Sequence, residues 1–144
     1  MKRFVLLVMV AVMLFGIVGC NDSTNSEVKL KKRNVEDYLT LETTDYEIYN
    51  ERVGDLAFYS NFFKIGVSVK SKVDADYTDA KLTLRVVVHS NKSTFYKEQP
   101  YELSEKGEYS GEVIIQLQNG GLEEVGPIQY SVVIKKVEGT VKTK

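Results

Sequence analysis

The sequence is poor in the residues on which covalent cross-linking, metal binding and nucleophilic catalysis usually depend. Its 144 residues include one cysteine, one histidine, two prolines and no tryptophan. One cysteine excludes an intrachain disulfide, and one histidine leaves only carboxylates as further zinc ligands. His89 is followed directly by Ser90, and adjacent residues of a strand point to opposite faces, which does not suit a nucleophile and its base. We therefore expect no catalytic residues and no cofactor.

Long apolar runs are also missing, with one exception at the start of the chain. Phe4 to Val18 are fifteen uncharged apolar residues that follow Lys2 and Arg3. A membrane-spanning helix needs about 20 such residues. A basic start, a shorter apolar stretch and small residues before a cleavage point are typical of a secretory signal peptide. The pattern predicts a helical signal peptide over residues 1–19.

The single cysteine stands at the end of this run. The residues Ile17-Val18-Gly19-Cys20 resemble the lipobox of bacterial lipoproteins, with an aliphatic residue three positions before the cysteine and a small one directly before it. The resemblance implies that the Cys20 sulfur receives a diacylglyceryl group, that the chain is cut between Gly19 and Cys20, and that the new amino terminus is often acylated. Two or three acyl chains bind a bilayer far more firmly than one. We expect an extracytoplasmic protein of the cell envelope, held on membrane lipid by Cys20; the alternative is an unmodified cysteine after an apolar run.

Residues 20–33 form the expected connection between the anchor and the domain. Asn21 to Ser26 are small and polar, which is typical of a flexible tether. Four of the five residues from Lys29 to Arg33 are basic, and this cluster has two interpretations: an edge strand protected by lysines, or a contact with anionic lipid. Cleavage after Gly19 leaves 17 basic and 20 acidic side chains. This balance argues against a nucleic-acid partner, which needs a basic face.

Residues 34–144 are predicted to be one domain made mainly of strands. Asn34 to Leu39 suit one helical turn with Asn34 as its cap. Apolar and polar residues then alternate over 63–70, 80–89, 109–117 and 128–135, and less clearly over 39–43, 46–49 and 95–101. Alternation with period two indicates strands that bury one face. About seven such strands predict an all-β fold, an immunoglobulin-like antiparallel sandwich. Its expected core is Ile65, Val67, Val69, Leu82, Leu84, Val86, Val88, Val113, Ile115, Leu117, Ile128, Tyr130, Val132 and Ile134.

Three stretches resemble known lipoprotein and sandwich domains. The order of strands and turns over 34–141 is similar to that of FxLYD-type and other small sandwich domains of bacterial lipoproteins. The opening Asn34 to Leu39 looks like that of uncharacterised Gram-positive lipoproteins. Leu103 and Tyr109, with Gly107 between them, resemble part of the tyrosine corner of fibronectin type III domains. These resemblances imply a lipid-anchored sandwich, and the families bring no enzymatic activity.

Two groups of residues are candidates for binding. Tyrosine is abundant, and rigid rings with a polar tip suit recognition, so the candidate binding surface is Phe58, Tyr59, Phe62 and Tyr77. The alternative is that these rings close the ends of the sandwich. Weak candidates for a calcium site are Asp74, Asp76 and Asp79 in an expected loop, where the alternative is a solvated acidic loop.

The preferred hypothesis is a non-catalytic binding module for an envelope or secreted protein. The alternative is a small-ligand or glycan receptor that uses a tyrosine-rich end of the sandwich.

The lipid anchor can be tested at its one essential atom. We expect Cys20→Ala to abolish incorporation of labelled fatty acid and to leave an uncleaved precursor, because no other thiol can form the thioether. Mass spectrometry and membrane fractionation measure both effects. An unchanged mass and an unchanged distribution would overturn the prediction.

Overall fold

The computed structural model describes residues 26–55 and 58–144. The predicted signal peptide, its cleavage point at Gly19 and the predicted lipidation of Cys20 lie outside these residues. The described chain contains a one-turn helix, α2 (Val35–Tyr38), and a short 3-10 helix, η2 (Leu122–Glu124). Its strands are β1 (Glu27–Lys29), β2 (Leu39–Val53), β3 (Phe58–Ser71), β4 (Ala75–His89), β5 (Thr94–Glu102), β6 (Tyr109–Asn119) and β7 (Gln129–Thr143).

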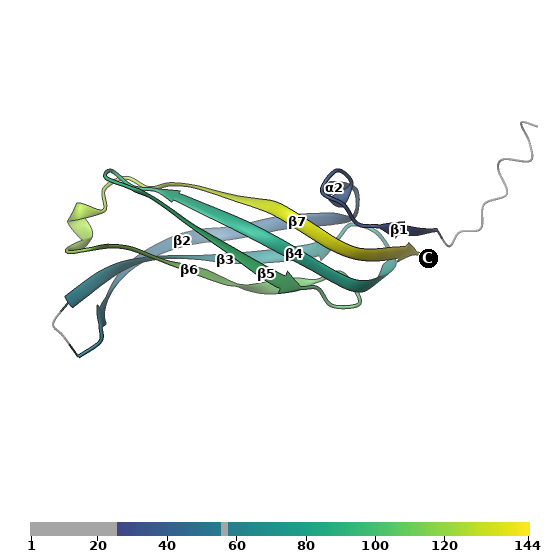
Figure 1. Ribbon diagram of the computed structural model, residues 1–144, viewed down its shortest axis with the longest axis horizontal. Helices are drawn as coiled ribbons and strands as arrows, with labels where there is room; N and C mark the ends of the chain where they lie inside the picture. Colours follow the sequence, from purple (N-terminus) through teal and green to yellow (C-terminus); the bar gives the residue numbers. More distant parts are fainter. Residues whose placement is uncertain (1–25, 56–57) are drawn as a thin grey trace, which may run out of the picture.

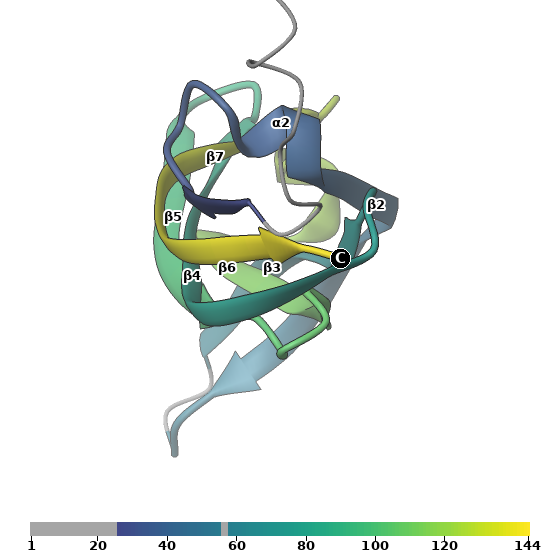
Figure 2. The same cartoon turned by 90° about the vertical axis from the view of Figure 1, so that its right-hand side faces the viewer.

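The seven strands form two antiparallel sheets that face each other, so the predicted all-β sandwich is confirmed (Figure 1 and Figure 2). One sheet has the order β1-β7-β4-β5 and the other β2-β3-β6. The likeness to immunoglobulin domains is one of architecture and not of strand order. Their four-stranded sheet contains the first, second, fourth and fifth strands, whereas the four-stranded sheet here contains β1, β4, β5 and β7. Here β7 returns to lie beside β4 after β5 and β6, which gives a Greek-key arrangement of the last four strands.

The core lies between the central strands β3 and β4. Alternate side chains of both strands are at most 2% exposed, as their period-two pattern predicts. Burying each of these aliphatic or aromatic side chains contributes about 1.5–3 kcal/mol relative to leaving it exposed. They are Phe63, Ile65, Val67 and Val69 of β3 and Leu82, Leu84, Val86 and Val88 of β4.

The core prediction is only partly right for β7. Val132 and Ile134 are half-buried, and Tyr130 is 36% exposed. The deepest residues of β7 are instead Val137 and Val141, beyond the predicted end of this strand. The register shifts where Thr83 and Leu84 of β4 face Lys136 and Ile134, and this bulge leaves Lys135 unpaired with β4. Because the bulge inserts one extra residue, the side chains of β7 that face the core are at even positions before it and at odd positions after it.

The acidic segment 74–79 is mostly strand, not the loop expected from its composition. β4 begins at Ala75, and Asp76 to Thr78 pair with Thr140 to Lys142 of β7. A second irregularity follows, at which Asp79 has a positive φ of 49° and Gly139 on β7 has a φ of 112°. The Gly139 carbonyl accepts a hydrogen bond from the Leu30 N–H at 2.9 Å. This irregular site therefore also holds the beginning of the domain.

The folded domain begins before residue 34. Glu27 to Lys29 pair with Thr140 to Lys142 of β7, and Leu30 is 1% exposed. The second half of the predicted tether 20–33 is thus part of the domain. Of the basic cluster Lys29 to Arg33, only Lys29 lies in the edge strand, because β1 ends there. The helical turn is confirmed as α2, which buries Val35.

The Asn34 side chain does not cap α2 as expected. It accepts a hydrogen bond from the Lys31 N–H at 2.7 Å and donates one to the Lys29 carbonyl at 3.1 Å. Asn34 therefore fixes the turn that precedes the helix.

Tyr109 packs differently from the expected tyrosine corner. Its ring centroid lies 4.4 Å from that of Tyr101, and its hydroxyl lies over Gly111, further along β6, instead of turning back toward Leu103. Tyr101 is 6% exposed, and burial raises the pKa of its hydroxyl to about 12. The two rings close the side of the core between β5 and β6.

The irregular site at Gly139 yields a stability prediction. A Cβ at Gly139 would lie 2.6 Å from the Ala80 Cα and 2.8 Å from the Asp79 carbonyl oxygen, and both are backbone atoms that cannot move aside. We expect Gly139→Ala to lower the free energy of unfolding by about 2 kcal/mol or more. Urea unfolding at fixed pH measures this loss.

Gly54→Ala is the matched control. Gly54 also has a positive φ, of 70°, but a Cβ there would meet no atom of the described residues within 4 Å, so only backbone strain of about 1 kcal/mol is expected. Equal losses in the two variants would contradict the steric argument.

Candidate binding surface

The β2–β3 hairpin ends at the opposite end of the sandwich from the two ends of the described chain. β1 enters beside the last residues of β7, because Glu27 pairs with Lys142. Figure 1 shows both at one end of the long axis and the end of the hairpin at the other. Because the strands run along this axis, the hairpin projects away from the point where the chain enters.

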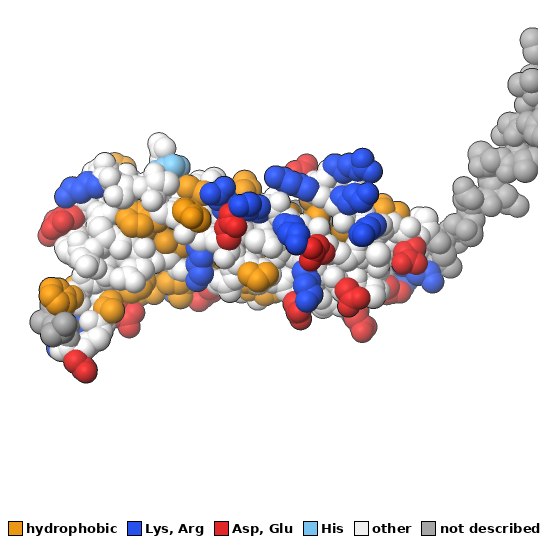
Figure 3. Space-filling view, viewed as in Figure 1, with side chains coloured by type: hydrophobic (Ala, Val, Ile, Leu, Met, Phe, Trp, Pro, Cys, Tyr) orange, Lys and Arg blue, Asp and Glu red, His pale blue; other side chains and the backbone are white. Residues whose placement is uncertain are grey.

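Two aromatic rings are exposed at the end of this hairpin. Phe58 is 62% exposed, Tyr59 is 53% exposed, and Val53, which pairs with Phe58 across the hairpin, is 43% exposed. We call Val53, Phe58 and Tyr59 the tip surface. Figure 3 shows hydrophobic side chains at this end of the molecule. Exposing large apolar side chains to water at one end of the molecule is unfavourable, so these residues suit a contact site.

The other two predicted surface residues lie elsewhere. Phe62 is half-buried and stacks on Tyr49, with ring centroids 5.3 Å apart. Tyr77 is 4% exposed and lies near the opposite end, where its hydroxyl donates to the Tyr38 carbonyl at 3.2 Å and bonds the Ser71 hydroxyl at 2.7 Å. Burial raises the pKa of the Tyr77 hydroxyl. Tyr77 therefore belongs to the core, because segment 75–79 is strand and turns this ring inward.

A buried amide fixes the base of the tip surface. Asn61 is fully buried, and its side-chain N–H groups point at the carbonyls of Gln118, Gly120 and Gly121, at 3.2, 3.4 and 3.2 Å. Its side-chain oxygen accepts a hydrogen bond from Asn50 at 2.9 Å. Buried polar groups are costly unless they are paired, and a fully paired network fixes one arrangement of the chain. Asn61 thus ties the hairpin to the end of β6.

Ser60 extends this network. It is 1% exposed and accepts a hydrogen bond from the Gln116 side chain at 2.8 Å, while its hydroxyl donates to Asn119. The register of β3 against β6 is irregular between Ser60 and Phe62, and such a bulge redirects side chains. Sequence reasoning missed this cluster. The feature of the sequence that could have indicated it is the polar pair Ser60-Asn61, which stands between the aromatic pairs 58–59 and 62–63.

A shallow hollow lies beside the tip surface. Its volume is about 420 Å³, and it is lined by Asn50, Phe58, Tyr59, Asn119, Gly120 and Gly121. The Asn50 amide already donates to Asn61 and to the Gly120 carbonyl, the latter at 3.0 Å. The hollow therefore offers mainly apolar surface to a partner.

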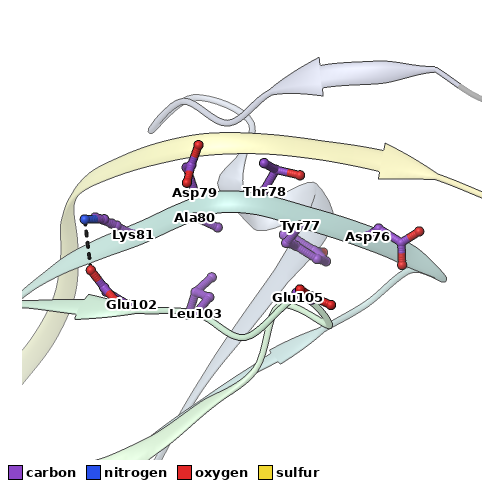
Figure 4. Close-up of a pocket in the computed structure, with 9 residues that line it drawn as sticks. All are labelled: Asp76, Tyr77, Thr78, Asp79, Ala80, Lys81, Glu102, Leu103 and Glu105. Atoms are coloured by element: carbon purple, nitrogen blue, oxygen red, sulfur yellow. Dashed lines mark ion pairs between the residues drawn. The ribbon is translucent and has the colours of Figure 1, made fainter.

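The three candidate calcium ligands do not form a cluster. Asp76 pairs with Lys144, at 2.8 Å, and Asp74 lies 4.0 Å from the same ammonium group. Figure 4 shows Asp76 and Asp79 separated along β4, beside a hollow of about 440 Å³. Within residues 26–55 and 58–144, no three acidic, histidine or cysteine side chains come together to hold an ion.

The exposed groups with shifted pKa values belong to ion pairs on the strands. A hydrogen bond to Glu102, at 2.9 Å, raises the pKa of Lys81 and lowers that of the carboxyl (Figure 4). Lys135 lowers the pKa of Glu98 in the same way. His89 bonds the Thr94 hydroxyl at 2.8 Å through Nδ1. These pairs join strands of the four-stranded sheet, Lys135 reaching Glu98 across β4, and none borders the tip surface.

Comparisons with protein-family models, curated proteins and solved structures found no match to this chain. In the part of the chain that the structure describes, no helix is long and apolar enough to cross a membrane.

The buried amide can be tested through stability. We expect Asn61→Ala to lower the free energy of unfolding by about 1–3 kcal/mol, because it leaves buried carbonyls without a donor. Asn91→Ala, at an exposed position, should change stability by less than about 0.5 kcal/mol. Denaturant unfolding of both variants checks the difference, and similar values would show that Asn61 does not fix this end.

Proposed function

We propose that this protein is a lipid-anchored, extracytoplasmic, non-catalytic binding module that contacts a protein partner through its tip surface. The observation that carries the proposal is the position of Phe58 and Tyr59 at the end opposite to the entry of the chain. An anchor at Cys20 would attach the protein by the other end. The tip surface then lies at the end remote from the attachment point, where other envelope or secreted proteins can contact it.

The length of the connection supports this placement of the tip surface. Six residues lead from Cys20 to Ser26, and an extended chain of that length spans at most about 20 Å. The sandwich is elongated, and its strands run from the anchored end to the hairpin (Figure 1). The tip surface is therefore the part that reaches furthest from the attachment point.

The chemistry of the tip surface suits a protein more than a sugar. Phenylalanine and tyrosine rings supply large apolar contact area and lose little conformational freedom on binding. A sugar also needs free hydrogen-bonding groups, whereas the amides beside these rings are already paired within the protein. Three exposed side chains make a small contact, which is typical of a transient complex.

Site-specific photo-crosslinking on intact cells tests the proposal. A photoreactive residue in place of Tyr59 should form an adduct with a defined protein, because this side chain is exposed at the tip surface. The same residue in place of Tyr96, which is 64% exposed on β5, should not. Phe58→Ala should reduce the Tyr59 adduct about tenfold, which corresponds to about 1.4 kcal/mol.

Equal adducts from positions 59 and 96 would exclude the tip surface as the specific contact. If position 59 gives no protein adduct but labels a glycan, the protein is a glycan receptor. Membrane fractionation of the same cells tests the lipid anchor separately.

A further inference from the structure

We propose that a basic patch at the anchored end docks on the anionic surface of the bilayer and sets the orientation of the domain. The basic patch consists of Lys29, Lys31, Lys32, Arg33 and Lys72, all of them exposed. The inference rests on the proposed lipid anchor. Figure 3 shows Lys and Arg side chains gathered around α2, near the end where the described chain begins.

The patch is held on a fixed turn. Leu30 and Val35, on either side of Lys31 to Arg33, are 1% and 3% exposed. The Asn34 N–H donates to the Lys31 carbonyl at 3.0 Å, and the Asn34 side chain accepts from the Lys31 N–H. Two buried anchors and a closed turn hold these three cations on the surface of the domain, whereas cations on a flexible tether would have no fixed direction.

Lys72, which directly follows β3, completes the patch. Its backbone N–H donates to the Tyr38 carbonyl at 2.8 Å, and its ammonium donates to the Glu36 carbonyl at 2.6 Å. Lys32 and Lys72 line a groove of about 570 Å³ between α2, β2 and β7, together with Glu36 and with apolar walls that include Leu41 and Ile134. Two cations at an apolar groove suit a phosphate headgroup with its glycerol and the first carbons of an acyl chain.

The charges of the patch are not neutralised within the domain. Among the described residues, none of its five cations forms an ion pair with a carboxylate, whereas eight other Lys and Arg side chains do. The nearest carboxylates in sequence are Glu27, Glu36 and Asp37, which the five cations outnumber. Over the rest of the described chain, acidic residues exceed basic ones. Positive charge is therefore concentrated in the patch, and the remaining surface has a net negative charge.

The anchor brings this patch within range of the bilayer. Attraction to an anionic surface acts over about one Debye length, roughly 8–10 Å in physiological salt. The connection from Cys20 to Ser26 spans at most about 20 Å, so attachment by Cys20 keeps the patch near the headgroups. Each Lys or Arg close to such a surface strengthens binding several-fold. The anchored domain should therefore rest with α2 and the groove against the lipid.

Energy transfer to labelled headgroups tests this orientation in the acylated full chain. Acylation blocks Cys20, so a cysteine introduced as Val133→Cys, beside the same groove, carries the only donor dye. The protein is reconstituted in vesicles of phosphatidylcholine alone or with about one third phosphatidylglycerol. We expect at least about twofold greater transfer with the anionic lipid, and a loss of this increase in about 0.5 M sodium chloride.

Charge-reversed variants distinguish an effect of the patch from an effect of the net charge of the domain. Lys31→Glu/Lys32→Glu should abolish the increase, and Lys92→Glu/Lys97→Glu, with the same change in charge outside the patch, should retain it. Equal transfer in both kinds of vesicle, or loss of the increase in both variants, would overturn the proposal. The mass of the acyl group and flotation with either vesicle test the anchor independently, so a failed anchor is distinguished from a failed patch.

Discussion

The structure depends on the packing of β3 against β4 across the sandwich. Each of these strands lies inside its own sheet and presents four fully buried side chains to the other. The chain has no disulfide to restrict the unfolded state, so burial of apolar area between these two strands must offset most of the conformational entropy lost on folding. The remaining strands extend the two sheets on either side of this contact, and α2 covers one end of the gap between β2 and β7 (Figure 2).

The predictable parts of the fold are those in which one residue pattern continues without interruption. Over β3, β6 and most of β4, alternation predicted both the strand and its buried face. It failed at Lys135 and at Asp79, because a bulge inserts a residue that no pattern of hydrophobicity marks. Composition failed for segment 75–79, where acidic residues occupy the outward face of a strand while Tyr77 faces the core. Strand pairing could not be predicted at all, since it depends on contacts between residues far apart in the chain.

The candidate site shows the same division. The residue types of Phe58 and Tyr59 suggested recognition, but the sequence left open whether their rings face solvent or close an end of the sandwich. The role of Asn61 could not be predicted, because its carbonyl partners at 118–121 lie almost sixty residues later. A single polar residue in a strand is usually taken to point to solvent. Only the fold shows that this amide is enclosed and that it positions the rings.

The short β1 strand has a mechanical consequence. A partner that pulls on the hairpin while the other end is held would load the strands along their length, so that hydrogen bonds between them are sheared together instead of unzipped in turn. β1 is held least firmly, because it has only three residues to pair with β7. It would detach first and release residues 27–34, adding about 25 Å of slack. The force would then pass into β2, which runs paired with β3 as far as the hairpin, and the sandwich would stay closed.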